Sequence, residues 1–366
     1  MRSALGCIAL GLGLLMVAGT FDAEPLYVTG CALALLGLGA IAWIGIGGRG
    51  AGVHRVLGSR SVMEEEPFDV LVEATAGRFP LPPGWIDEPL LPEAIRVAAG
   101  RRRARVRVEV TFARRGRREL APPALVLRDP FGLAQRVVAG PAGDEVLVLP
   151  RVSAVRAAGG GGDAHQAIRA RASLTAAAET EIDGLRPHRE GAPASRIHWA
   201  SLARGHGLME RKLISEADSR PLIVLDPRGG TPDALDAAVR AAASLTVFFA
   251  KAGGCGLLLP GDRRPAVIER DLLAWPNAHV RLAVLDDRAG PALVSAQNRR
   301  GLVVYVAARV VDRVPRALGR MPGGCLLVIP GELPSRRPVV EVAGCSGYVG
   351  QRGGAGAALA AVEAAG

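Results

Sequence analysis

The chain begins with two long apolar segments. Residues 4–19 carry no charge, residues 20–25 include Asp22 and Glu24, and residues 26–47 are again uncharged. A helix needs roughly 20 apolar residues to cross a hydrocarbon core of about 30 Å. The second segment reaches this length, and the first reaches it with its flanks. We therefore expect a transmembrane hairpin of two helices, since backbone groups in lipid must pair internally. A cleavable signal peptide is the alternative for the first segment.

The arginines that flank these segments predict the orientation. Arg2 precedes the first segment, while Arg49, Arg55 and Arg60 follow the second, and the connecting loop is acidic. The positive-inside rule places both ends of the hairpin, and everything after it, in the cytoplasm. Arginines this close to the bilayer can approach anionic headgroups, so membrane lipids are expected partners.

From residue 67 to residue 152 the apolar positions alternate. In residues 105–112, Val106, Val108 and Val110 are predicted to face one side of a strand, and the charged residues between them the other. Further strands are expected at residues 69–75, 124–128 and 145–149, with turns between them. Short strands with polar outer faces favour a small antiparallel β-sandwich.

After residue 221 the pattern changes to continuous apolar runs that alternate with helical periodicity. The predicted strands are 222–225, 255–259, 281–285, 302–307, 325–329 and 339–342; the predicted helices are 232–251, 292–299 and 315–320. Buried strands that alternate with helices are typical of an α/β fold with a doubly wound parallel sheet.

These patterns divide the 366 residues into five parts. They are a two-helix transmembrane hairpin (1–60), a β-sandwich-like domain (61–155), a linker and motif arm (156–220), the α/β domain (221–350) and a C-terminal tail (351–366), in which residues 355–365 form a small-residue helix. The linker prediction rests on the glycine-rich residues 157–162.

Composition narrows the range of partners. The net charge is +10, and Lys212 and Lys251 are the only lysines, so arginine carries almost all of the positive charge. Such a balance favours acidic proteins, anionic lipid or nucleic acid. The clusters 101–103 and 114–118 have only Phe112 nearby for base stacking, so we expect solvated hairpin ends and no nucleic-acid binding. The five cysteines form no metal-binding spacing.

The segment 183–209 concentrates arginine, histidine and tryptophan. It contains Gly184-Leu-Arg-Pro-His-Arg-Glu-Gly191 and Arg196-Ile-His-Trp199, and the strand ending at Asp226 follows. The candidate motif or partner-binding residues are Asp183, Arg186, His188, Arg189, Glu190, Arg196, His198, Trp199 and Arg204. We expect the arginines to pair with Asp183 and Glu190, and Trp199 and Leu202 to serve as apolar contacts of the arm. A partner-binding face of arginine and tryptophan is the alternative.

These motifs resemble those of the bacterial domain-of-unknown-function-58 family. The resemblance extends to Arg114-Arg-Gly-Arg-Arg118 and to the turn Asp129-Pro-Phe-Gly132. The turn itself predicts a buried Phe131. The family has no settled reaction. The resemblance implies a bacterial inner-membrane protein with a von Willebrand factor A-like domain and a MoxR-type AAA+ ATPase as partner. Where the family has Tyr and Gly-Asp, this chain has His188 and Gly191-Ala192, which weakens any acid–base or metal role for the loop.

In metal-binding von Willebrand A-like domains the first strand ends in D-x-S-x-S, whose oxygens hold a divalent cation. Here the run is Asp226-Pro-Arg-Gly-Gly230, which lacks both serines. We predict that Asp226 marks a degenerate metal-site position, binds no metal, and pairs with Arg228 or caps the following helix.

Together these features predict a membrane-anchored binding or assembly protein that faces the cytoplasm, with no catalysis and no cofactor of its own. One alternative is a hydrolase or nuclease that uses Asp183, His188, Glu190 and His198. Another is an envelope protein that binds a polymer or lipid.

Overall fold

The structure is a computed structural model. It describes residues 2–158, 185–187, 198–205, 207–211, 220–296, 301–315, 318, 324–334 and 336–349. The chain divides into two compact units. The first comprises residues 1–113 and 117–148, and the second comprises residues 114–116 and 149–366. The fold is mixed α/β with several sheets and two apolar helices at the N-terminus.

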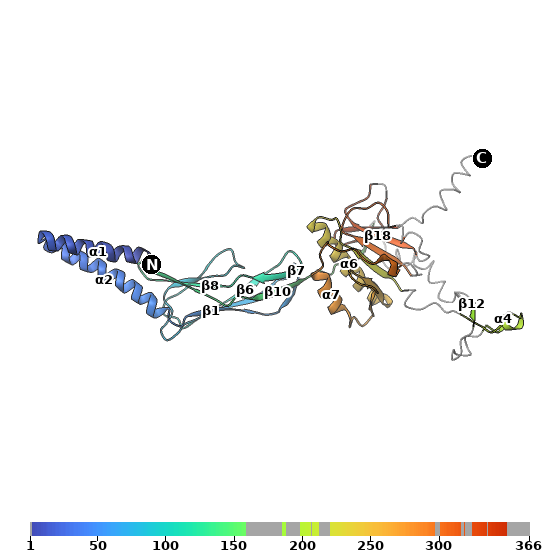
Figure 1. The fold of residues 1–366 in the computed structure, drawn as a ribbon, viewed down its shortest axis with the longest axis horizontal. Helices are drawn as coiled ribbons and strands as arrows, with labels where there is room; N and C mark the ends of the chain where they lie inside the picture. The colour runs from blue at the N-terminus through green and yellow to red at the C-terminus, as the bar shows by residue number, and fades with distance from the viewer. Residues whose placement is uncertain are drawn as a thin grey trace. The chain divides into compact units, whose positions relative to one another are not determined.

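The two N-terminal helices, α1 (Arg2–Phe21) and α2 (Glu24–Gly47), lie side by side (Figure 1). Both are long and apolar enough to span a membrane, which confirms two helices in this region. Glycines allow their close contact: a Cβ atom on Gly37 would lie 2.7 Å from the Ala4 carbonyl oxygen, and one on Gly11 would lie 2.7 Å from the Gly30 carbonyl oxygen. Such spacing brings helix backbones together without large side chains between them.

The strands of the first unit form three sheets, ordered β1-β3-β6, β2-β10-β7 and β5-β4-β8-β9. Their bounds are β1 Gly52–Leu57, β2 Ser61–Met63, β3 Phe68–Thr75, β4 Gly84–Asp87, β5 Ile95–Val97, β6 Arg103–Val110, β7 Gly116–Leu120, β8 Ala124–Arg128, β9 Gln135–Ala139 and β10 Asp144–Leu149. The first and third sheets are antiparallel throughout.

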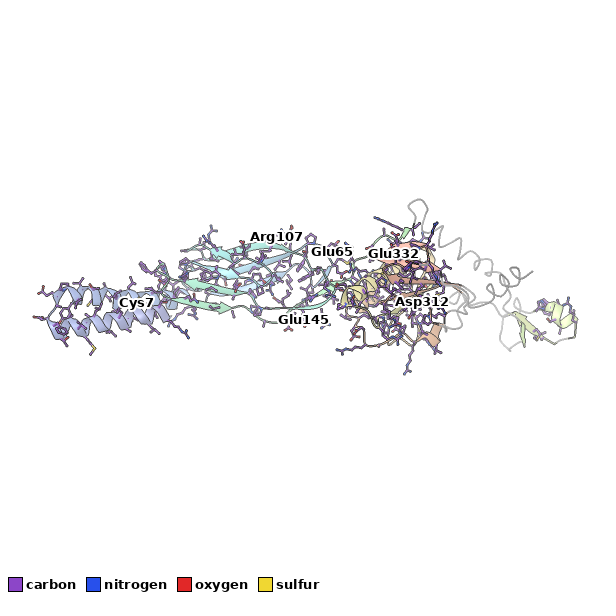
Figure 2. All side chains as sticks on the ribbon, turned by 90° about the horizontal axis from the view of Figure 1, so that it is seen from above. Cys7, Glu65, Arg107, Glu145, Asp312 and Glu332 are labelled. Carbon is purple, nitrogen blue, oxygen red and sulfur yellow. The ribbon has the colours of Figure 1, made fainter. Side chains whose placement is uncertain are left out.

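The alternation predicted for residues 105–112 is confirmed in β6, where Arg105, Arg107 and Glu109 are exposed and the valines turn inward. The strands of the first and third sheets share one core, which includes Val72, Ile86 and Leu125. Ala40 and Ile44 of α2 belong to the same core, and the amide of Ala4 donates to the Leu133 carbonyl at 3.1 Å. The ends of the helix hairpin at residues 4 and 44 therefore pack on the strands as part of one hydrophobic core (Figure 2, where Cys7 marks the hairpin).

The second unit contains an eight-stranded sheet in the order β11-β19-β20-β18-β17-β14-β15-β16. Its strands are β11 Arg156–Ala157, β14 Leu222–Asp226, β15 Cys255–Leu258, β16 Ala266–Ile268, β17 Val303–Ala307, β18 Cys325–Pro330, β19 Val340–Val342 and β20 Cys345–Val349. The four central strands, β15, β14, β17 and β18, are parallel, as the sequence predicts.

Both edges of this sheet are antiparallel, which the prediction of a doubly wound parallel sheet did not include. The connections explain the difference, because parallel neighbours need a crossover of a dozen or more residues. Only residues 259–265 separate β15 from β16, and Ala343-Gly344 alone joins β19 to β20. Both of those turn residues have positive φ, 51° and 78°, which is typical of a tight hairpin.

Two helices, α6 (Pro232–Gly253) and α7 (Trp275–Ala283), pack into the core on one side of this sheet (Figure 1). The prediction of a helix at 232–251 is confirmed, with Thr231 as its N-cap and Pro232 at its first turn. The strand predicted at 281–285 is wrong. Ala278, His279, Leu282 and Ala283 are buried at helical spacing, and the short apolar run at its end imitates a strand.

The helix predicted at 292–299 is present as a short 3₁₀ helix, η2 (Leu293–Ala296), within the described residues. Most of the predicted helix 315–320, and all of 355–365, lie outside the described residues.

Candidate functional site

The arm predicted around the arginine-rich motif contains a small ordered structure. Strand β12 (Leu185–Pro187) pairs antiparallel with β13 (Met209–Arg211), and the one-turn helix α4 (Trp199–Ala203) lies between them in sequence. The amide of His198 donates to the Met209 carbonyl at 2.8 Å, which ties the start of α4 to β13. The Nδ1 atom of His198 lies 2.7 Å from Oγ of the buried Ser201.

Trp199 and Leu202 do not act as apolar contacts within the described part of the arm. Trp199 is 60% exposed, Leu202 is 42% exposed and Leu208 is 39% exposed. A helix of a single turn has too little surface to bury side chains on more than one face, and here it buries Ser201. The arm therefore presents three large apolar side chains to solvent.

Three of the nine motif residues predicted from sequence, His198, Trp199 and Arg204, are described with their side chains, and Arg204 is exposed. Arg186 is described only through its backbone in β12. The other five, Asp183, His188, Arg189, Glu190 and Arg196, lie outside the described residues, and so does the network predicted among them.

Asp226 lies at the carboxyl end of β14, a strand buried along its whole length. Its Oδ1 accepts from Nε of Arg228 at 2.8 Å, and its Oδ2 accepts from Nη2 of Arg228 at 3.1 Å. The hydroxyl of Tyr305, on the neighbouring parallel strand β17, donates to Oδ2 at 2.6 Å. Nη2 of Arg309 lies 3.7 Å from the same oxygen. The ion pair between Asp226 and Arg228 that the sequence predicts is therefore present, while Thr231, not Asp226, caps α6.

Burial alone would raise the pKa of Asp226, but the hydrogen bonds from Arg228 and Tyr305 outweigh it and hold that pKa below its usual value. Burial and the bond to Asp226 raise the pKa of Tyr305, so its hydroxyl stays protonated and donates. The group is thus a fixed arrangement of one carboxylate, one phenol and two guanidiniums.

The surroundings of Asp226 do not fit a divalent cation. Both carboxylate oxygens of Asp226 already accept from the Arg228 guanidinium. Gly290 packs closely on this guanidinium: a Cβ atom added to Gly290 would lie 2.5 Å from Cζ of Arg228. A cation would have to displace two positive groups while gaining no serine oxygen in return. Elsewhere in the described residues, no group of three or more His, Cys, Asp or Glu side chains could hold a metal ion.

A second charged cluster was missed by sequence reasoning. Arg115 is buried, pairs with Asp236 of α6, and donates from Nη2 to the Leu285 carbonyl at 2.9 Å and from Nε to the Leu282 carbonyl at 3.2 Å. Nε of Arg114 donates to Asp236 at 2.9 Å. The prediction of a solvated hairpin end is therefore wrong for Arg115. Its partners lie more than a hundred residues away in sequence, and no local pattern reveals them.

The turn at Asp129-Pro-Phe-Gly132 is confirmed, but its predicted buried phenylalanine is not. Asp129 is buried and accepts from the amide of Phe131 at 2.9 Å, while Phe131 itself is 70% exposed. Phe131 lines a pocket of about 320 Å³ together with Trp43 and Leu36 of α2. The carboxylate, not the ring, fixes this turn.

Arg55 was predicted to lie near lipid headgroups, and the structure places it elsewhere. Its side chain is fully buried and pairs with Glu88 and, at 3.2 Å, with Asp144. It also donates to the Ala121 carbonyl at 2.8 Å. Arg49 and Arg60 are exposed.

No protein-family model matches the chain, and no match is found among curated proteins.

Proposed function

We propose that this chain is a membrane-anchored binding or assembly protein, held by α1 and α2, with the strands of the first unit and the second unit in the cytoplasm. We further propose that it has no chemistry of its own. The length and apolar character of the two helices support the anchor, and the flanking Arg2, Arg49 and Arg60 support the orientation.

The observation that carries the proposal is the pairing of Asp226. Ligands of open α/β sheets bind beyond the carboxyl ends of the strands, and Asp226 is the carboxylate at that end of the central strand β14. Its two oxygens are held by Arg228 and Tyr305. A carboxylate held in this way stabilises the end of the sheet and is poorly suited to act as a base or a metal ligand.

We also propose the finer fold assignments: a β-sandwich in the first unit and a degenerate von Willebrand A-like domain in the second. The shared core of the two antiparallel sheets supports the sandwich. The parallel centre of the large sheet, with the aspartate at the tip of β14, supports the second assignment. The resemblance to the domain-of-unknown-function-58 family implies a MoxR-type AAA+ ATPase as the partner.

The arm formed by β12, α4 and β13 is the proposed contact surface. It combines an exposed tryptophan, two exposed leucines and the exposed Arg204. Tryptophan and arginine are enriched among the residues that dominate protein–protein affinity.

Crosslinking in membranes tests this proposal. A photoreactive amino acid placed at Leu208 should capture an AAA+ ATPase, identified by mass spectrometry, and Trp199→Ala should reduce the capture at least tenfold, as expected for an interface residue worth about 2 kcal/mol or more.

The matched control is Leu273→Ala, which also removes an exposed apolar side chain, 80% exposed, but lies outside the arm. Equal capture by wild type, Trp199→Ala and Leu273→Ala would contradict the arm as the contact surface. Capture that contains no ATPase would contradict the partner.

A hydrolase remains the second candidate because Nδ1 of His198 lies 2.7 Å from Oγ of Ser201. The two residues are three positions apart on one helical turn, and Ser201 is only 5% exposed, so its hydroxyl is poorly placed for attack on a substrate. Hydrolysis of ester or phosphodiester substrates that is abolished by both Ser201→Ala and His198→Gln would favour the enzyme.

A further inference from the structure

The first unit contains an apolar pocket where the last two turns of α2 meet the loop before β4. The pocket has a volume of about 730 Å³, within the range of small-molecule sites. Ala42, Trp43 and Ile46 line it from the helix, and Phe79, Pro80 and Pro82 line it from the loop. Every lining residue is apolar or glycine.

The loop is held firmly against the helix. Leu81 is buried in the core that also contains Ala40 and Ile44, and its amide donates to the Arg101 carbonyl at 2.9 Å. The amide of Gly100 donates back to the Leu81 carbonyl at 3.0 Å. Pro82 packs closely on Gly47: a Cβ atom added to Gly47 would lie 2.7 Å from the Pro82 ring. The loop that lines the pocket is thus anchored on the core of this unit through Leu81.

Four arginines adjoin the pocket-lining segments in sequence, and we take them as the rim of the pocket mouth. Arg49 follows the helix, Arg78 precedes Phe79, and Arg101 and Arg102 follow Gly100. All four are exposed, and none pairs with a carboxylate in the described part of the chain. No Asp or Glu occurs in residues 39–49, 77–82 or 97–103, from which the lining and its rim are built.

The depth of the pocket fits the boundary between acyl chains and headgroups. The 24 residues of α2 are about 36 Å long at 1.5 Å each, a few ångströms more than a hydrocarbon core of about 30 Å. Its last turns therefore reach the headgroup region. Trp43, Ile46 and Phe79 are 55%, 47% and 45% exposed, and aromatic side chains concentrate at this level of a bilayer.

We propose that this pocket holds an acyl chain of an anionic phospholipid, whose phosphate lies against the arginines at the pocket mouth. The proposal rests on the membrane anchor of the proposed function. An anionic lipid complements both the apolar lining and the four guanidiniums. A second copy of the chain is a poorer occupant of this pocket, because it would bring its own four arginines against these four.

Native mass spectrometry of the full-length protein, released from phosphatidylcholine vesicles that contain phosphatidylglycerol, tests this site. The wild-type protein should retain phosphatidylglycerol. Ala42→Trp, which fills the pocket, should abolish retention, whereas Ala32→Trp, at another exposed alanine of the same helix, should not.

A charge variant provides a test that leaves the core untouched. Arg101→Gln combined with Arg102→Gln should weaken phosphatidylglycerol retention roughly 30-fold, as expected for two charges near an anionic surface. Arg118→Gln, an exposed arginine on β7, should leave retention unchanged.

Three results would each overturn the lipid site. They are retention of phosphatidylcholine equal to that of phosphatidylglycerol, retention of phosphatidylglycerol by Ala42→Trp, and a wild-type dimer that Ala42→Trp converts to a monomer. If alkaline carbonate removes the protein from membranes, the anchor of the proposed function fails and the lipid site fails with it. If the protein stays in membranes but retains no phosphatidylglycerol, only the lipid site fails.

Discussion

At the residue scale, two buried charged side chains, Asp226 and Arg55, are each held by several partners. Asp226 is bound by Arg228 and Tyr305, and Arg55 by Glu88, Asp144 and a backbone carbonyl. Buried charges cost free energy unless they are paired and hydrogen-bonded. In both groups a buried carboxylate, Asp226 or Glu88, is paired with an arginine, and removal of that arginine leaves the carboxylate buried without compensation.

Asp226→Asn should lower the free energy of unfolding by about 2 kcal/mol at neutral pH, because it weakens hydrogen bonds made to a charged acceptor. The pKa of Asp226 is lowered below the ordinary 3.8 in the folded protein. Its contribution to stability is thus complete above about pH 4 and is lost as pH falls through the folded pKa. Thermal unfolding in detergent at a series of pH values measures this.

The difference in the free energy of unfolding between the wild type and Asp226→Asn should consequently become smaller below pH 4. Asp312→Asn is the control, since the Asp312 side chain is 80% exposed and its pairing with Arg313 is a surface contact. A stability difference between the two proteins that is constant from pH 7 to pH 3 would show that the Asp226 carboxylate is not bound as described.

Arg55→Met should destabilise the first unit by about 3–5 kcal/mol, because Glu88 would remain buried without its partner. The Glu88 side chain is 1% exposed. The double variant Arg55→Met with Glu88→Met should recover much of this loss. Arg107→Met, at an exposed pair with Asp69, should change little. Urea unfolding in detergent compares the four proteins; a double variant no more stable than Arg55→Met would argue against the buried pair.

At the residue scale, sequence indicates what lies close in the chain. The pairing of Asp226 with Arg228 is predictable because two positions separate them. Tyr305 and Arg309 join the same carboxylate only through the parallel register of β14 and β17, and Arg115 reaches Asp236 from 121 positions away. Phe131 was misplaced because an apolar residue in a turn suggests burial, while the folded turn is fixed by Asp129.

At the element scale, periodicity predicts α6 and nine of the twenty strands in the described residues, because each of these buries one regular face. β8 has the predicted bounds, and β3, β6, β10, β15, β17 and β18 differ by a few residues. Most of the other strands are too short to show a pattern; β2, β5 and β16, for example, have three residues each. The helix α7 was mistaken for a strand, because its nine residues give too few turns to distinguish the two. Antiparallel edges were not predicted, because strand direction depends on the lengths of connections as well as on burial.

The contact between α1 and α2 depends on glycines at their crossing. Gly37→Leu should separate the helices, because its side chain would meet the Ala4 carbonyl and the Ile8 side chain. The expected result is a lower thermal midpoint in detergent and faster proteolysis of the hairpin. Gly13→Leu is the matched control, since a Cβ at Gly13 has nothing within 4 Å. Equal behaviour of the two variants would mean that the helices are not packed through Gly37.

At the scale of the whole molecule, each unit has its own core, and the hairpin shares the core of the first unit. Composition and pattern predicted two apolar helices followed by β-rich and α/β parts. Neither could predict which partner the arm binds, because affinity depends on how the hot spots and charges of two surfaces complement each other, and one sequence shows only one of the two surfaces.

The central claim is that the hairpin spans a membrane and that the strands of the first unit and the whole second unit lie in the cytoplasm. Protease added to spheroplasts and to inside-out vesicles tests it most directly, with an epitope tag after Gly366 to follow the chain. The account predicts that the tagged protein survives intact in spheroplasts and is degraded in inside-out vesicles. Degradation in spheroplasts with protection in inside-out vesicles would contradict it, and with it the proposed cytoplasmic partner.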